Sequence, residues 1–163
     1  MGYKKFSILA ASFGGGAVSL FIGENQNIIK TLVLWNPIID YHSILKPKLP
    51  WPKANFGKEA MQKLKKQGFV KISKRNFKVG SAFFDELRRL HPWKELRKVK
   101  IPILFIHGDK DSYVPCEDSI KYSNLFKNAS LELIKGGEHG FHNSKEIAEK
   151  AYNKTIEFFL KNF

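Results

Sequence analysis

Short apolar runs alternate with segments of helical character along most of this sequence, and the alternation predicts its fold. Residues 6–11 form an apolar run with the length of a buried strand, and we expect a helix after it that ends near residues 23–25. A strand, a helix and a second strand in this order predict parallel pairing through a right-handed crossover. The other expected strands are residues 28–35, 102–107 and 130–134. The sequence therefore predicts an α/β fold with a parallel sheet and flanking helices.

Two further helices complete this scaffold, at residues 117–126 and 145–163. The second is amphipathic. The side chains that we expect to face the core from it are Ile147, Ala151, Ile156, Phe159 and Leu160.

Residues 40–92 interrupt the alternation between the second and third strands. They contain a loop rich in proline and lysine that includes Trp51, a helix over 57–67, a hairpin over 68–79 that turns at Lys74-Arg75-Asn76, and a helix over 81–90. Aromatic residues are dense in this segment, which favours a cap or lid over a site. A surface excursion without a function is the alternative.

Length and composition fit one domain, with the cap inserted in it. The 163 residues are 43% hydrophobic, which can supply a core, and no apolar run has the length of a membrane span. The single cysteine, Cys116, excludes an internal disulfide and a zinc site built from cysteines. We therefore expect a cytoplasmic protein.

The net charge of +13 is high for a chain of this size. Lysine supplies 24 of the 28 basic residues, and the lysines are scattered along the sequence. Arginine, which binds phosphates and bases through two parallel hydrogen bonds, occurs at only four positions. The charge is therefore interpreted as a solvated lysine surface, and no nucleic-acid partner is expected.

Ser12 lies between the first strand and its helix, with Ala10 two residues before it and Gly14 two residues after it. A small residue, serine and glycine at this spacing fit a nucleophile elbow, in which a sharp strand-to-helix turn exposes the serine. The turn needs small neighbours because larger side chains would collide across it. A phosphate-binding loop does not fit the spacing of the glycines, but a plain strand-loop-helix connection does.

Two more candidates follow later strands. Asp111 comes shortly after the third strand and His139 after the fourth, so both should lie with Ser12 at the carboxyl edge of the sheet, where ligands bind in open α/β sheets. Asp109 is an alternative acid and His142 an alternative base. His107, at a strand end, is interpreted as a structural hydrogen-bonding residue.

Together these motifs resemble the α/β-hydrolase superfamily, which has the order serine, acid, histidine. The segment PILFIHGDKDSYVP resembles the superfamily's acid-bearing segment, with Asp111 as the acid, and GGEHGF resembles its histidine loop, with His139 as the base. The closest likeness is to serine esterases, dienelactone hydrolases and serine aminopeptidases.

The resemblance implies a serine hydrolase that acts on a small-molecule ester or related acyl bond, most simply a carboxylesterase, with peptidase, thioesterase and acyl-transfer activity open. Ser12 would be the nucleophile, and the N–H of Phe13 would be one oxyanion donor. No cofactor and no metal are expected. A catalytically inactive remnant, or a basic binding module of the same fold, is the alternative.

The resemblance covers only the C-terminal half of the superfamily's domain, because there the nucleophile follows the fifth of about eight strands. We therefore expect an N-terminally truncated chain in which the strand at residues 6–11 has an open edge. Such an edge can pair with another chain, so a homodimer is expected as one outcome.

Overall fold

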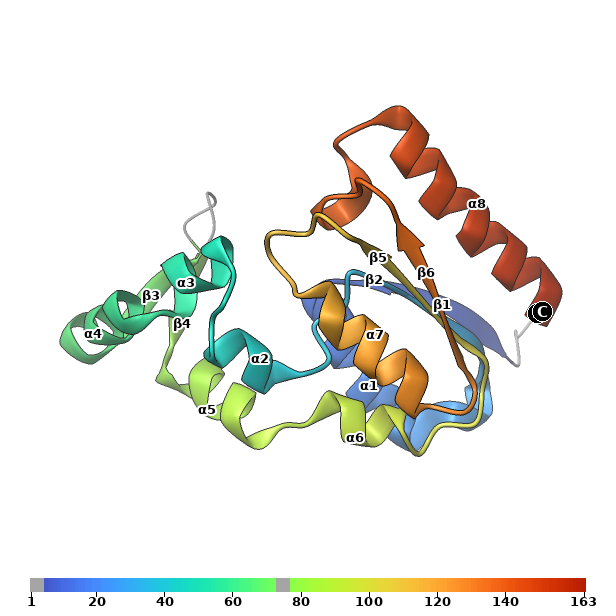
Figure 1. The fold of residues 1–163 in the computed structure, drawn as a ribbon. Helices are drawn as coiled ribbons and strands as arrows, with labels where there is room; N and C mark the ends of the chain where they lie inside the picture. Colours follow the sequence, from blue (N-terminus) through green and yellow to red (C-terminus); the bar gives the residue numbers. More distant parts are fainter. Residues whose placement is uncertain (1–4, 73–76) are drawn as a thin grey trace.

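A four-stranded parallel sheet forms the centre of the computed structural model, which describes residues 5–72 and 77–163 (Figure 1). Its strands run in the order β1-β2-β5-β6. They are β1 (Phe6–Ala11), β2 (Ile29–Trp35), β5 (Ile103–Gly108) and β6 (Ala129–Ile134). β2 and β5 are buried on both faces, which explains why they are nearly continuous apolar runs. The predicted parallel sheet with flanking helices is confirmed.

Helices cover both faces of the sheet (Figure 1). On one face α1 (Phe13–Asn25), α6 (Pro92–Leu96) and α7 (Cys116–Leu125) enclose a core that includes Leu34, Phe105 and Tyr122. On the other face α8 (Lys145–Asn162) packs over β2, β5 and β6. Two short 3-10 segments, η1 (Gln26–Ile28) and η2 (His139–Phe141), lie in the connections.

The inward face of α8 differs from the prediction. Ala151 and Thr155 are buried against the sheet, whereas Ile156 and Leu160 are 53% and 78% exposed, so the prediction for these two residues is wrong. The buried indole N–H of Trp35 donates a hydrogen bond of 2.9 Å to Thr155 Oγ1. A buried indole N–H needs an acceptor, so a threonine takes the position expected for an isoleucine.

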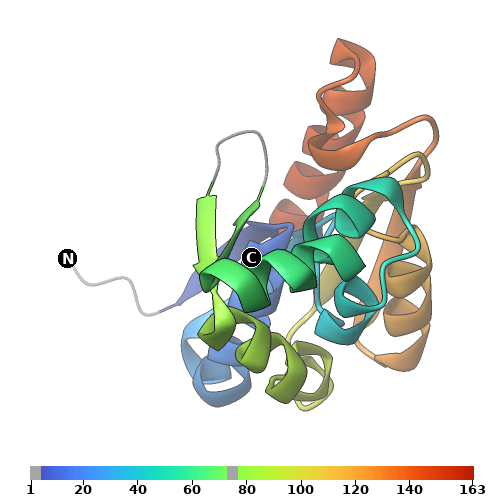
Figure 2. The same ribbon diagram turned by 90° about the vertical axis from the view of Figure 1, so that its left-hand side faces the viewer.

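The described residues between 40 and 92 lie beside the sheet (Figure 1) and face the viewer in Figure 2, and we call them the 40–92 lobe. The lobe holds four complete helices and a hairpin of two antiparallel strands, and it ends at Pro92, the first residue of α6. Its helices are α2 (Tyr41–Leu45), α3 (Pro50–Phe56), α4 (Lys58–Gln67) and α5 (Ser81–Arg89), and its hairpin joins β3 (Phe69–Ile72) to β4 (Phe77–Gly80). The predicted hairpin is present, and its expected turn at Lys74-Arg75-Asn76 falls outside the described residues.

The predicted loop around Trp51 is wrong, because this stretch forms α3. Pro50 lies at the start of that helix, where its missing N–H costs nothing and its fixed φ suits the helix. Phe56 from α3 then packs with Val70 and Phe84 in the core of the 40–92 lobe. The prolines therefore start a helix here.

α1 approaches the chain after β2 so closely that Gly16 has no room for a side chain. A Cβ on Gly16 would collide with the carbonyl oxygen of Ile38 and with the Tyr41 ring, whereas a Cβ on Gly14 would meet nothing within 4 Å. Both glycines lie in the first turns of the same helix, which makes them a matched pair.

We predict that Gly16→Ala lowers the free energy of unfolding by about 1–3 kcal/mol, because overpacking forces the helix away from Ile38. Gly14→Ala should be neutral or stabilising, because alanine favours the helix by about 1 kcal/mol over glycine. Urea unfolding measures both. Equal stability of the two variants would contradict the close approach.

Candidate active site

Ser12 occupies the sharp turn between β1 and α1. Its backbone has φ 52° and ψ −128°, a conformation that strains any residue except glycine. Three hydrogen bonds hold the turn: the Ser12 N–H donates to the Trp35 carbonyl at 3.0 Å, and the Ser12 carbonyl accepts from Gly15 and Ile38 at 3.0 and 2.9 Å. The chain on both sides of the turn therefore fixes the serine.

The structure brings Ser12, His139 and Asp111 into one chain of hydrogen bonds. Ser12 Oγ lies 3.1 Å from His139 Nε2, and His139 Nδ1 lies 2.8 Å from Asp111 Oδ2. The carboxylate only accepts, so Nδ1 carries the imidazole proton and Nε2 accepts from the serine hydroxyl. This is the arrangement in which a histidine can take a proton from a serine.

Asp111 is buried, and four donors surround its carboxylate. Oδ1 accepts from the N–H groups of Tyr113 and Val114 at 2.7 and 2.9 Å, and Oδ2 accepts from His139 and, at 3.3 Å, from His107 Nε2. Burial alone would raise the pKa of Asp111, but the hydrogen bonds from His107 and His139 outweigh it and hold that pKa well below its usual range. The carboxylate is therefore ionised at neutral pH.

The sequence interpretation missed the contact between His107 and Asp111. His107 is fully buried, and its Nδ1 lies 2.7 Å from Ser119 Oγ. Its Nε2 faces two acceptors, the Val114 carbonyl and the Asp111 carboxylate, so Nε2 carries the proton and the Ser119 hydroxyl donates to Nδ1. The only signal in the sequence is the spacing of four residues between His107 and Asp111.

The alternative acid and base lie elsewhere. Asp109 Oδ1 accepts from the Gly136 N–H at 2.6 Å, and its side chain makes no hydrogen bond to His139. His142 is exposed and bonds to neither Ser12 nor Asp111. The geometry therefore favours Asp111 and His139 over Asp109 and His142.

The amide of Phe13 is the first N–H of α1. It makes no hydrogen bond to any residue in the described part of the chain. The first amides of a helix lack intrahelical partners and carry partial positive charge. This N–H is thus available beside Ser12.

A cavity of about 680 Å³ opens at Ser12 and His139. Its walls are mostly apolar and come from the sheet edge and from the 40–92 lobe. The residues that line it are Ser12, Phe13, Ile38, Trp51, Ile72, Phe77, Val79, Phe83, Tyr113, Val114 and His139. The Tyr113 ring packs edge-on against both the His139 and the Trp51 ring, so the lobe and the His139 loop meet at the cavity.

Within the described residues, no group of three His, Cys, Asp or Glu side chains is arranged to hold a metal ion. In the same residues, no helix combines the length and the apolar character needed to cross a bilayer.

Comparisons with known proteins agree with this fold. The profile of the prolyl oligopeptidase family matches residues 2–163. The chain is similar to the solved structure of Est1E from Butyrivibrio proteoclasticus (TM-score 0.76, 23% identity, 97% of this chain and 61% of that one). It is also similar to a monoacylglycerol lipase of Paleococcus ferrophilus (TM-score 0.66, 19% identity, 98% of this chain and 70% of that one).

Among curated proteins, the non-heme chloroperoxidase CPO-A1 of Kitasatospora aureofaciens is 33% identical over 69 residues, which are 42% of this chain and 25% of that protein. The chain thus spans about three fifths of the length of Est1E, and its match spans a quarter of the chloroperoxidase.

The environment of Asp111 predicts a dependence of stability on pH. A carboxyl whose pKa is depressed on folding stabilises the protein above its unfolded pKa of about 4, and this contribution is lost as the pH falls below that value. Asp111→Asn should therefore lower the free energy of unfolding more at pH 5 than at pH 3. Urea unfolding at both values measures the difference.

Asp109→Asn, on the same loop, is the matched control, because the Asp109 side chain is exposed. A loss of stability that is the same at both pH values for Asp111→Asn would contradict the depressed pKa of Asp111.

Proposed function

Because the chain belongs to the prolyl oligopeptidase family, within the α/β-hydrolase superfamily, we propose that it hydrolyses carboxylic esters or a related acyl bond through Ser12, His139 and Asp111. The observation that carries the proposal is the chain of hydrogen bonds from Ser12 through His139 to Asp111 at the wall of the cavity. The strained turn at Ser12 fits a nucleophile elbow.

The reaction follows from the positions of the protons. Ser12 Oγ attacks the acyl carbon while His139 Nε2 takes the hydroxyl proton, and the imidazolium then gives this proton to the leaving alcohol. A water molecule attacks the acyl-serine in the second half: His139 takes its proton, the acid leaves, and Ser12 regains its hydrogen. Asp111 keeps the imidazole in the tautomer that this cycle needs and stabilises the imidazolium.

The negative oxygen of the tetrahedral intermediate needs donors close to Ser12. The free N–H of Phe13 supplies one, and the helix that begins there adds partial positive charge. Removal of one such donor typically costs about 10²–10³ in rate, so this amide contributes substantially to the proposed activity.

The cavity favours an uncharged acyl group, because aromatic and aliphatic side chains form most of its wall. The 40–92 lobe provides several of them, including Trp51 and Phe83. In this proposal the lobe acts as a cap that shields the reacting carbon from water. Carboxylesterase activity fits the cavity best, and peptidase and thioesterase activity are alternative outcomes of substrate tests.

We predict that the protein hydrolyses a short p-nitrophenyl ester and that a fluorophosphonate labels Ser12. Ser12→Ala should reduce hydrolysis by about 10³-fold or more and abolish labelling, because the variant lacks the attacking oxygen. Initial rates and mass spectrometry of the labelled peptide are the measurements. Ser112→Ala, on the exposed part of the Asp111 loop, is the control and should keep the activity.

Hydrolysis that survives Ser12→Ala would exclude Ser12 as the nucleophile. A folded protein with no labelling and no hydrolysis would favour the second candidate function, an inactive binding module of the same fold.

We also propose that two copies of the chain associate through β1. This strand has one neighbour, β2, among the described strands, and its exposed side chains include Phe6 and Leu9. Unpaired N–H and C=O groups along an edge strand can pair with another chain. The only charged side chain on the described chain just before β1 is that of Lys5, so little opposes the pairing.

Light scattering should show a mass that rises with concentration toward the dimer. Leu9→Lys should suppress this rise, because a charge on an edge strand opposes pairing. Leu133→Lys is matched to it, since Leu133 is similarly exposed (45% against 42%) on β6 at the opposite edge. A monomer at all concentrations would rule out association through β1.

A further inference from the structure

The positive charge of the protein is concentrated in the 40–92 lobe. These residues, about a third of the chain, include 13 basic and 4 acidic side chains and carry +9 of the total charge of +13. The basic residues appear scattered along the sequence, yet most of the excess charge falls on one lobe beside the sheet (Figure 2). Most of the excess positive charge therefore lies on one part of the exposed lysine surface.

The described lysines of the lobe are exposed and available to bind a partner. Nine of them lie in its described part, all nine are exposed, and none forms an ion pair with another described residue. They are Lys46, Lys48, Lys53, Lys58, Lys63, Lys65, Lys66, Lys71 and Lys78. By contrast, several lysines of α8, such as Lys145 and Lys150, pair with glutamates of the same helix.

The hairpin of the lobe has one cationic and one apolar face. Lys71 and Lys78 lie directly opposite each other on β3 and β4, an arrangement that destabilises a hairpin because the charges repel. The opposite face carries Ile72, Phe77 and Val79, which line the cavity at Ser12. Lys78 Nζ lies 4.8 Å from the centre of the Phe69 ring, and no described acidic side chain pairs with either lysine, so this face is open to an external anion.

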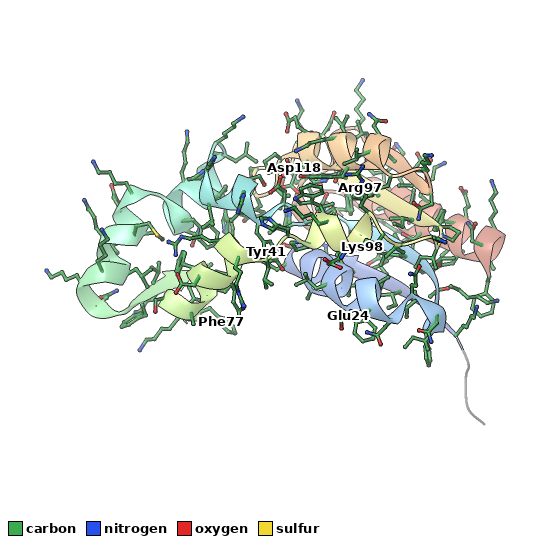
Figure 3. All side chains as sticks on the ribbon, turned by 90° about the horizontal axis from the view of Figure 1, so that it is seen from below. Glu24, Tyr41, Phe77, Arg97, Lys98 and Asp118 are labelled. Atoms are coloured by element: carbon green, nitrogen blue, oxygen red, sulfur yellow. The ribbon has the colours of Figure 1, made fainter. Side chains whose placement is uncertain are left out.

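Phe77 is 68% exposed although it also lines the cavity, so it lies at the cavity's rim. Figure 3 labels it at the lower margin of the lobe. Phe77 lies on the face of the hairpin opposite Lys71 and Lys78. An exposed aromatic ring beside a cationic face is typical of surfaces that bind the interface of an anionic membrane, where the ring enters the headgroup layer and the lysines contact the headgroups.

We propose that the 40–92 lobe binds anionic lipid surfaces with an edge of its hairpin toward the lipid, so that Phe77 from one face and Lys71 and Lys78 from the other reach the headgroups. Because Phe77 lies at the rim of the cavity, this orientation turns the cavity toward the lipid. The proposal does not depend on the hydrolase activity, since it concerns binding alone.

A nucleic acid would match the same charge but not the side chains that carry it. Recognition of phosphates and bases favours arginine, whose planar fork donates two parallel bonds. In the described part of the lobe the arginines are Arg88 and Arg89, and Arg88 is paired with Asp85 at 2.7 Å. An exposed phenylalanine on a lobe rich in lysine fits a lipid surface better.

The test is sedimentation of the protein with lipid vesicles. We expect at least tenfold tighter binding to vesicles with about one third phosphatidylserine than to pure phosphatidylcholine, and a steep loss of binding as salt screens the charges. A parallel sample without vesicles accounts for self-association.

Two charge-matched variants locate the surface. Replacing Lys63, Lys66, Lys71 and Lys78 by glutamine should weaken binding about 600-fold, since each lysine near an anionic surface contributes about fivefold. Replacing Lys100, Lys127, Lys135 and Lys161, which are exposed outside the lobe, removes the same charge and should change binding less than about threefold. Phe77→Ser should weaken binding with no change in charge, and circular dichroism checks that each variant is folded.

Three results would overturn the proposal. One is equal binding to neutral and anionic vesicles. Another is an equal loss in the two lysine variants, which would show that total charge alone matters. The third is a gel shift with duplex DNA at low salt by a protein that does not bind vesicles. If the lobe variant fails to fold, the proposal is still tested by how vesicle binding of the wild-type protein depends on lipid composition and salt.

Discussion

The site depends on the backbone hydrogen bonds that join the turn at Ser12 to the end of β2 and to the chain after it. Hydrogen bonds from Ser12 to the Trp35 carbonyl and from Ile38 to the Ser12 carbonyl tie β1, β2 and the start of the 40–92 lobe together at one point. A strained backbone persists only where its surroundings determine it, and here parallel strand pairing supplies that constraint. The hydrogen bond from the Ile38 N–H also positions Ile38, which lines the cavity. The same hydrogen bonds therefore hold both Ser12 and part of the cavity wall in place.

A second set of close contacts brings the other two residues to Ser12. The Asn36 side chain accepts from the Gly108 N–H at 2.9 Å. Gly108 lies so close to Gly137 that a Cβ on Gly108 would collide with the Gly137 carbonyl, and a Cβ on Gly137 would lie only 3.1 Å from the Gly108 Cα. The loop before His139 is thereby pressed against the end of β5. Asp111, three residues beyond Gly108, can then reach His139 because both loops start from neighbouring strands.

The sheet and the proposed site residues could be predicted from sequence because both leave local signals. The buried strands are nearly continuous apolar runs, and Ser12, Asp111 and His139 each follow one of them, so topology alone places them at one edge.

The rotation of α8 could not be predicted, because its apolar residues cover more than one face and Trp35, far away in sequence, selects Thr155. The helix at Pro50 was missed because a proline that starts a helix and one that breaks a loop look alike in a single sequence. The contact of His107 with Asp111 depends on how the loop after β5 folds back, which the spacing of four residues does not specify by itself.

The distribution of charge in the folded protein was also only partly visible in the sequence. Lysines that are separated along the sequence fall within one lobe because the chain leaves the sheet after β2 and returns only at β5. The nearly balanced remainder of the chain has acidic partners for several of its lysines, as on α8, whereas the lobe has few. Uncompensated like charges lower stability, so such a lobe persists most readily where an external anion offsets the repulsion. Part of the apolar wall of the cavity and the pair Lys71 and Lys78 belong to opposite faces of the same two strands, β3 and β4, so only the thickness of one hairpin separates the lysines from the cavity.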